Sequence, residues 1–520
     1  PGAFENVRCV SMLDPDDLGV WVWRTCSVGH LRWTGTVVTC PTELMEQMST
    51  WNNLQADAVQ AICGELESSI RHQEYAYAHR ADLPKLDIAK SRPIDWEQSI
   101  VEGHATHPMH RARHAMPPLA RITPSTEFKH VRLGFVAVPR AVMAIQGDYD
   151  SLLMPLFRSA EPNPEAEAQS IMETVDGERE VIVPVHPLHM PAIRAKFKFA
   201  RPLPFSAAAE AQASLRTVSP MALEASGYDI KLPLGAKTSS ALRTVSTWSA
   251  FLGPQLTNLV PQMLQANPNA PLVAGEPASI ILRDADNDVA KYLACIVRVS
   301  AQKLCQGNRD ARAVVAASLT ERNAAGRSNV VELLNLHSVE QRLGFLRAYV
   351  SKLFSAFLPS ILTHGFTFEA HQQNTLVVLS AATGLPIQFM IRDFGGIMVH
   401  METFKEAAGF EIPMLPDNST TAADLDEVYG VAYHTIVQCQ IHRLVRALGL
   451  HYEGDGWQVV REEFEKCVPH ESPLYVAWTR REVRLKSFIT MKLGGLYRDY
   501  VYGSVPNILF YRNEQQGVAF

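Results

Sequence analysis

The sequence predicts an α+β protein with a helical N-terminal part, a sheet-rich middle and a largely helical C-terminal part. In residues 41–80, apolar side chains recur at near-helical spacing, and the same pattern runs through residues 328–362. Between these segments, short apolar runs such as EVIVPVHP at 180–187 are typical of strands. Helices and strands that are segregated along the chain indicate an α+β architecture. The three expected parts are residues 1–130, 131–325 and 326–520.

Local signals support the individual elements of each part. The N-terminal helical pattern begins at Pro41-Thr42-Glu43, which is a favourable helix start. In the middle, residues 279–300 predict a hairpin that turns at 284–287. Further strands are expected at the start of 131–146 and over 197–205. Further helices are expected over most of 420–452 and 475–500.

Composition argues against several classes of protein. The chain has 520 residues and a formal net charge of −6, which does not suit a nucleic-acid binder or a basic membrane-surface protein. No stretch of 18 uninterrupted apolar residues predicts a transmembrane helix. The eight cysteines are scattered and form no CxxC pair, which favours reduced thiols in the cytosol. We therefore expect a cytoplasmic protein with neither nucleic acid nor membrane as a partner.

The segment that is most informative about chemistry is a predicted hairpin with polar residues at its open end. HGFTFEAHQQN at 364–374 leads into one strand, and RDFGG at 392–396 follows the other. A two-residue turn at Thr383-Gly384 would pair the strands so that Asn374 lies opposite Asp393. The hairpin would then present a side-chain carbonyl and a carboxylate to the same space.

Two further residues of this segment extend the set. Glu369 and His371 would share a face if their segment is extended. Converging oxygen ligands suit Mg²⁺, which proteins commonly hold with one or two carboxylates plus substrate phosphates. The alternative is that these side chains only satisfy one another's hydrogen bonds at the mouth of the hairpin.

A second cluster combines arginine, lysine and hydroxyl side chains. SLRTVSP at 214–220 and KLPLGAKTSSALRT at 231–244 contain two Arg-Thr pairs in an otherwise apolar region. Guanidinium groups bind phosphate and carboxylate in a forked geometry, and hydroxyl groups add short hydrogen bonds. The cluster fits an anionic ligand such as ATP together with a polycarboxylate. The alternative is a solvated loop surface.

A third segment, EGHATHPMHRARH at 102–114, is rich in histidine. Imidazole is a common zinc ligand, but no Cys or carboxylate stands at ligand spacing, and Arg111 and Arg113 would repel a cation. Histidine and arginine together are better suited to an anion. For His186, in PVHP, a place in the core and a functional role are both open.

At these residues the sequence resembles the NRPS-independent siderophore synthetases of the aerobactin-synthetase type. That family carries GHxxHPxxKxRxG, PVHPWQ, SxRT, K…TSxxRT, HGxxxEAHxQN and RDxxG segments, and counterparts of all six lie within residues 102–396. The resemblance implies a cupped-hand architecture, with a helical thumb, sheet-rich fingers and a palm, and with ATP between fingers and palm. It also implies that a carboxylate attacks the α-phosphate and that an amine or alcohol then displaces AMP.

The resemblance assigns roles to individual residues. The residues implied to bind ATP are Ser214, Arg216, Thr217, Lys231, Arg243, His371 and Asp393. Those implied to hold the acid are His107, Arg111, Arg113, Ser239, Arg243 and His371. The implied Mg²⁺ ligands are Glu369, Asn374 and Asp393. The residues expected to stabilise the reacting phosphate and carboxylate are Arg243, His371 and Lys231.

The sequence departs from the family pattern on the acid side. Arg111 stands where the family has lysine, Ala115 where it has glycine, and Ser239 where it has threonine. PVHP is followed by Leu188-His189 instead of Trp-Gln. The resemblance therefore carries more weight for the adenylation chemistry than for the substrate, for which citrate is the first expectation.

We expect an AMP-forming carboxylate–amine ligase that uses ATP and Mg²⁺ and makes a siderophore or a related secondary metabolite. Its partners would be a small carboxylic acid and an amine, and a homodimer is a family expectation. One alternative is a kinase-like phosphotransferase, because His-Gly, Asn and Asp-Phe-Gly echo the kinase metal-binding pattern. Against it, no catalytic-base Asp follows His364-Gly365, and no GxGxxG loop lies near the start. The other alternative is a relative that binds a nucleotide without catalysis.

Overall fold

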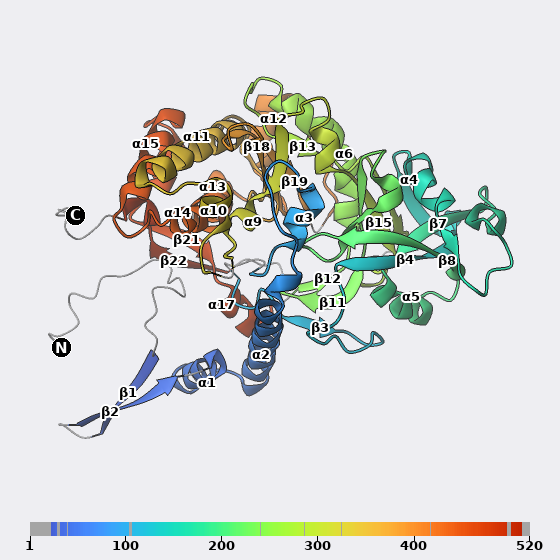
Figure 1. Cartoon of the computed structure of the whole chain (residues 1–520), viewed down its shortest axis with the longest axis horizontal. Coiled ribbons are helices and arrows are strands. Elements are labelled where there is room, and N and C mark those ends of the chain that lie inside the picture. Colours follow the sequence, from blue (N-terminus) through green and yellow to red (C-terminus); the bar gives the residue numbers. More distant parts are fainter. Residues whose placement is uncertain are drawn as a thin grey trace.

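The computed structural model confirms the α+β fold (Figure 1). Helices dominate the N-terminal and C-terminal parts of the chain, and most of the sheet lies between them. The described residues are 22–28, 32–38, 40–102, 107–239, 241–284, 286–323, 325–416, 418–496 and 501–511.

The N-terminal part begins with a hairpin and two helices. Figure 1 shows β1, β2 and α1 extending away from the rest of the molecule. The helical pattern over 41–80 forms two helices because Asn53 adopts a left-handed conformation, with φ of 50°, and ends the first. Met45, Ile62 and Leu66 pack with Met109, so this part is joined to the histidine-rich segment. The bounds are β1 Val22–Val28, β2 Arg32–Val38, α1 Pro41–Asn52, α2 Ala56–Ala78 and α3 Pro93–Gln98.

One large antiparallel sheet forms the middle, with strand order β5-β14-β15-β10-β9-β8-β4-β7 and β6 beside β8. Strands form at the expected places, except that residues 197–200 precede β8, and the expected hairpin is β14 and β15. The connection of this hairpin is longer than the turn expected at 284–287, because it includes the short helix α7 (Asn287–Ala290). The bounds are β4 His130–Pro139, β5 Met143–Gln146, β6 Glu161–Pro162, β7 Glu180–Val185, β8 Arg201–Ala211, β9 Thr217–Pro220, β10 Tyr228–Lys231, β14 Ala278–Leu282 and β15 Ala294–Val299.

A small sheet brings distant candidate residues together. Its strands are β12 (Ala241–Arg243), β11 (Leu234–Thr238) and β3 (Arg113–Ala115), in that order. Thr238 is opposite Arg113 on one side and Ala241 on the other. The histidine-rich segment is therefore attached directly to the arginine-rich one.

The C-terminal part combines a sheet with a long buried helix. The strand order is β13-β19-β18-β16, and α11 (Val339–His364) packs against β19. Among the described residues, α11 is the one helix long and apolar enough to span a membrane, but 61% of its apolar stretch is buried inside the protein. The bounds are β13 Leu272–Ala274, β16 Ala311–Val315, β18 Thr375–Ser380, β19 Pro386–Arg392, α6 Thr247–Leu264, α10 Asn329–Leu333, α12 Met401–Ala408, α13 Leu425–Ala432, α14 His442–Ala447 and α15 Asp455–Cys467.

Two expectations for the C-terminal part were wrong. Residues 475–500 are not mostly helical, because β21 (Glu482–Lys486) separates α16 (Pro473–Trp478) from α17 (Phe488–Leu493) and pairs with β22 (Tyr502–Pro506). The charged and apolar residues of β21 alternate, which is the strand period.

The register of the hairpin was also predicted wrongly. Thr375 pairs with Ile391, so the residue opposite Asn374 is Arg392, not Asp393. The connection runs from 381 to 385, and the pairing shifts at Val378/Leu379, which a two-residue turn does not allow for.

Candidate active site

All thirteen residues that sequence reasoning selected line one cavity of about 580 Å³. They come from the histidine-rich segment, from the β9, β10 and β12 region, and from both ends of the β18–β19 hairpin. The thirteen are His107, Arg111, Arg113, Ser214, Arg216, Thr217, Lys231, Ser239, Arg243, Glu369, His371, Asn374 and Asp393.

The cavity wall is strongly basic, although the chain carries a net charge of −6. Among the described residues that line it, ten are Lys or Arg and two are carboxylates. Such a wall attracts polyanions and strengthens their binding where water is excluded. The cations are Arg111, Arg113, Arg216, Lys231, Lys237, Arg243, Arg298, Arg392, Lys486 and Lys492, and the carboxylates are Glu369 and Asp393.

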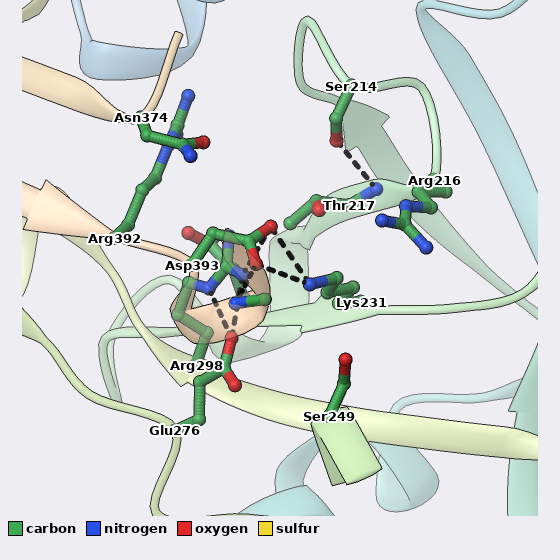
Figure 2. Close-up of polar contacts among 12 residues, drawn as sticks. Ser214, Arg216, Thr217, Lys231, Ser249, Glu276, Arg298, Asn374, Arg392 and Asp393 are labelled. Carbon is green, nitrogen blue, oxygen red and sulfur yellow. Dashed lines mark hydrogen bonds and ion pairs between the residues drawn. The ribbon is translucent and has the colours of Figure 1, made fainter. Parts of the chain in front are cut away.

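Asp393 lies at the centre of the ion-pair network in this wall (Figure 2). The Nζ of Lys231, a side chain 3% exposed, is 2.8 Å from its Oδ1 and 2.9 Å from its Oδ2, and Nη2 of Arg298 is 3.3 Å from Oδ2. Burial opposes ionisation of Asp393, but these cations hold the pKa of its carboxyl well below the usual range. Burial in turn lowers the pKa of Lys231. Asp393 has a φ of 69°, and its Oδ1 accepts a hydrogen bond from the Gly395 N–H at 3.0 Å.

Two buried glutamates support this wall from behind. Nη2 of Arg298 is 2.7 Å from Oε1 of Glu276, and Nη1 of Arg392 is 2.7 Å from Oε1 of Glu97. Arg392 also donates through Nη2 to the Gln373 carbonyl at 2.8 Å, which joins the two ends of the hairpin. Since each of these arginines has a carboxylate partner, their main effect is to position the cavity wall.

The β9–β12 region supplies the hydroxyl and guanidinium groups of the cluster found in the sequence. Ser214 Oγ accepts a hydrogen bond from the Thr217 N–H at 3.2 Å, and Arg216 donates to the Thr244 carbonyl. Nε of Arg243 donates to Thr238 Oγ1 at 2.5 Å. Figure 2 shows Ser214, Thr217 and Lys231 on the side of the site that Asp393 faces.

His371 is held as a neutral imidazole. Its Nδ1 accepts hydrogen bonds from the Gln373 and Asn374 N–H groups at 3.2 and 3.3 Å. Burial and the nearby Lys486 lower its pKa to about 4. At neutral pH the ring proton therefore lies on Nε2, which is 3.9 Å from Glu369 Oε2. The segment is a tight turn, because the His371 N–H donates to the Glu369 carbonyl at 2.9 Å, so the extended geometry that would place both side chains on one face is not present.

The residues expected to hold Mg²⁺ are a suitable donor set. Glu369 and Asp393 both approach the Asp393–Gly396 turn, since a Cβ on Gly396 would lie 2.0 Å from Glu369 Oε2 and one on Gly395 would lie 2.9 Å from Asp393 Oδ1. Asn374 donates through Nδ2 to the Glu369 carbonyl at 3.2 Å, so its Oδ1 remains the atom suited to a cation. No three His, Cys, Asp or Glu among the described residues form a metal cluster, so the set depends on this amide oxygen.

The histidine-rich segment forms one end of the cavity. His107 packs its ring on Phe488, with centroids 4.4 Å apart, and Ser239 Oγ donates to the His110 carbonyl at 3.2 Å. Burial lowers the pKa of Arg113 to about 9 and also lowers that of Arg111. Of the residues weighed for zinc, His104 lies outside the described residues.

Other candidate residues lie elsewhere or were missed. His186 is fully buried away from the cavity and has a pKa of about 3 because of burial, so it belongs to the core. The sequence analysis gave no role to several cavity residues: Lys237 and Arg392 stand inside the quoted motifs without a role, and the others lie outside those motifs. The missed residues include Lys237, Arg298, Arg392, His434, Cys439, Lys486, Phe488 and Lys492.

Two family models and several curated proteins match this chain. The IucA / IucC family model matches residues 92–321, and a model for ferric iron reductase FhuF-like transporters matches residues 344–476. The chain is 37% identical over 480 residues to the NRPS-independent siderophore synthetase rfs of Rhizopus delemar, covering 89% of this chain and 74% of that protein. It is 30% identical over 462 residues to the NRPS-independent siderophore synthetase-like protein ankE of Aspergillus thermomutatus, covering 86% and 74%.

A solved structure shares the fold. ATP-bound aerobactin synthetase IucA from Klebsiella pneumoniae superposes with a TM-score of 0.70 at 18% identity, over 94% of this chain and 92% of that one. The fold, the site and these relatives define an ATP-dependent ligase of siderophore biosynthesis. The chain belongs to the NRPS-independent siderophore synthetases of the IucA/IucC family.

Proposed function

We propose that this chain activates citrate, or a closely similar polycarboxylic acid, as an acyl adenylate and transfers the acyl group to an amine or alcohol. The observation that carries the proposal is the cavity itself, where basic side chains surround Asp393, Lys231 and His371. Two anions, the triphosphate and the acid, must approach within bonding distance, and their repulsion has to be offset. A wall this basic supplies that compensation.

In the first step, a carboxylate oxygen of the acid attacks the α-phosphorus, and the bond to the bridging oxygen breaks to release pyrophosphate. Ser214, Arg216 and Thr217 bind the nucleotide, and Lys231 and Arg243 stabilise the charge that builds up on the phosphorus oxygens. His371 donates from Nε2, the atom that carries its proton at neutral pH. It can thus hydrogen-bond an oxyanion without adding a second positive charge.

Mg²⁺ held by Glu369, Asn374 and Asp393 would neutralise phosphate charge. For Asp393 to bind the ion, part of its pairing with Lys231 has to be exchanged, and Lys231 then becomes available to a phosphate oxygen. The ionised state of Asp393, which its low pKa maintains, is the state that a cation ligand requires.

At the other end of the cavity, His107, Arg111, Arg113 and Ser239 hold the remaining carboxylates of the acid. Arginine in place of the family lysine at position 111 offers a forked contact, which suits a planar carboxylate. A polyacid is favoured over a monoacid because these cations lie beyond the side chains expected to bind ATP.

The test is a product analysis with purified protein, ATP and Mg²⁺. Citrate, 2-oxoglutarate and related acids are each combined with a panel of amines, and products are identified by mass spectrometry. The proposal predicts AMP, pyrophosphate and an amide or ester. Production of ADP would support the kinase-like alternative, which the family assignment does not favour. Absence of pyrophosphate exchange with every acid would support a non-catalytic nucleotide binder.

A further inference from the structure

A π-helix forms part of the cavity wall. The π-helix η9 comprises Tyr433–Ile441 and lies between α13 and α14. At the end of η9, the His442 N–H donates to the carbonyl of Val437, five residues earlier. All nine side chains are buried. Because π-helical turns are rare and concentrate at functional sites, this one calls for an explanation.

The widened turn places His434 and Cys439 on the same face, and both line the cavity. Their spacing of five residues equals one π-helical step, and Nε2 of His434 is 3.5 Å from Sγ of Cys439. The contact fixes the plane of the imidazole. In a regular α-helix, residues five apart would be rotated away from each other.

His434 lies at the acid-binding end of the cavity. Its ring is 6.3 Å from that of Phe488, which in turn packs on His107 at 4.4 Å. The neighbouring strand β21 brings Lys486 to the same wall. His434 is thus on the side where the acyl group is expected, apart from the hydroxyl-rich side that is expected to bind ATP.

The second step of the proposed reaction needs a proton acceptor. When an amine attacks the acyl adenylate, a C–N bond forms, the bond between the acyl carbon and the phosphate oxygen breaks, and AMP leaves with that electron pair. The amine nitrogen must lose a proton. A positioned imidazole is the commonest group for this task.

Several other titratable groups of the described wall already have partners of their own. Asp393 is paired with Lys231 and Arg298. Glu369 pairs with Lys486 at 3.4 Å. His110 uses both ring nitrogens, Nδ1 with the His107 carbonyl at 3.3 Å and Nε2 with Gln73 Oε1 at 3.0 Å.

His371 and His107 are engaged through Nδ1. His371 accepts two backbone N–H groups there, and His107 accepts the Met109 N–H at 3.1 Å. His371 is moreover assigned to the phosphate and carboxylate oxygens of the first step. His434 also has a partner, since its Nε2 lies 3.5 Å from Cys439 Sγ, but no part of the proposed first step is assigned to it.

We propose that the imidazole of His434 is the general base that takes the proton from the acceptor amine, and that Cys439 and the π-helix position it. The proposal rests on the proposed function, because it concerns the second half of that reaction. It assigns the two half-reactions to different side chains. Activation of the acid belongs to Arg243, Lys231 and His371, and amine transfer belongs to His434.

The experiment separates the half-reactions in His434→Gln, with His400→Gln as a matched control. His400 lies outside the cavity lining, where its Nδ1 is 2.9 Å from Thr403 Oγ1. Pyrophosphate exchange with the acid measures adenylation and also reports that the variant is folded. Product formation is then measured with an alkyl diamine and with hydroxylamine, which is a strong nucleophile that is largely unprotonated at neutral pH.

In His434→Gln, exchange should stay within about twofold of wild type, and amide formation with the diamine should fall by about 10²–10⁴-fold. Reaction with hydroxylamine should fall far less, and added imidazole should restore part of the diamine reaction. The control should behave as wild type. Equal loss with both nucleophiles, unchanged diamine turnover or loss of exchange would each overturn the assignment. If wild type itself shows no exchange, the proposed function fails instead.

Discussion

Replacing Lys231 with methionine should separate the structural and chemical roles of the ion pair at the centre of the site. The change keeps most of the side-chain volume and removes an ammonium that makes two contacts, at 2.8 and 2.9 Å, with Asp393. Lys231 is 3% exposed and Asp393 is 22% exposed, so the ammonium is buried and the carboxylate is mostly buried. Breaking a buried pair by removing one partner costs about 3–5 kcal/mol.

We expect the lower end of that range, about 3 kcal/mol, because Arg298 remains 3.3 Å from the Asp393 carboxylate. The double variant Lys231→Met/Asp393→Asn should recover most of this stability, since neither charge is then left unpaired. It should not recover activity, because adenylation needs both charges. Lys237→Met is the control: this lysine of the same wall is half-buried, and its loss should cost less than about 1 kcal/mol.

The assays are denaturant unfolding and pyrophosphate exchange on the same preparations. An unchanged unfolding midpoint in Lys231→Met would refute the view that the pair is a buried, mutually dependent unit. A double variant that is as unstable as the single one would refute the charge-compensation reasoning. A double variant with near wild-type exchange would refute the catalytic role of both groups.

Further predictions concern the metal, the acid and pH. Glu369→Gln should raise the Mg²⁺ concentration at half-maximal exchange by about 10–100-fold, whereas a shift only in the KM for the acid would contradict its role as a ligand. Arg111→Lys, which restores the family residue, should change the KM for the acid while the KM for ATP stays constant; equal changes in both would contradict its place at the acid end. Buried His186 and His371 have pKa values lowered from 6.5 to about 3 and about 4, so their neutral forms are favoured by folding. The stability they contribute is fully present above pH 6.5 and is lost progressively as pH falls towards 4, and unfolding midpoints measured between pH 8 and 4 should therefore decline; a flat profile would contradict the assigned burial.

The sequence allowed much of the fold to be predicted because its strongest patterns are local. The apolar spacing of α2 and α11 and the strand runs of β4 and β7 are properties of neighbouring residues. The candidate site could be predicted for a similar reason. Its residues lie in short polar motifs. These motifs meet because β3, β11 and β12 pair, and because the β18–β19 hairpin brings the residues before β18 next to those after β19.

What could not be predicted depends on contacts between distant segments. One irregular pair at Val378/Leu379 changes which residue faces Asn374. The strand β21 is stabilised by pairing with β22. Its alternation of charged and apolar residues covers only five positions, which is a weaker sequence signal than the helical pattern of the neighbouring residues. The positions of Arg298 and Arg392 in the cavity wall depend on ion pairs with Glu276 and Glu97. These partners are distant in the sequence, and no spacing rule connects them with the two arginines.

The central claim is that the acid is activated at the α-phosphorus of ATP. The most direct measurement is an isotope-transfer experiment in which the acid carries ¹⁸O in its carboxylates and the released nucleotide is analysed by mass spectrometry. If the acyl adenylate forms and is then attacked at the acyl carbon, one ¹⁸O atom is transferred to AMP for each amide bond made. AMP without the label, or label found in inorganic phosphate, would contradict the account.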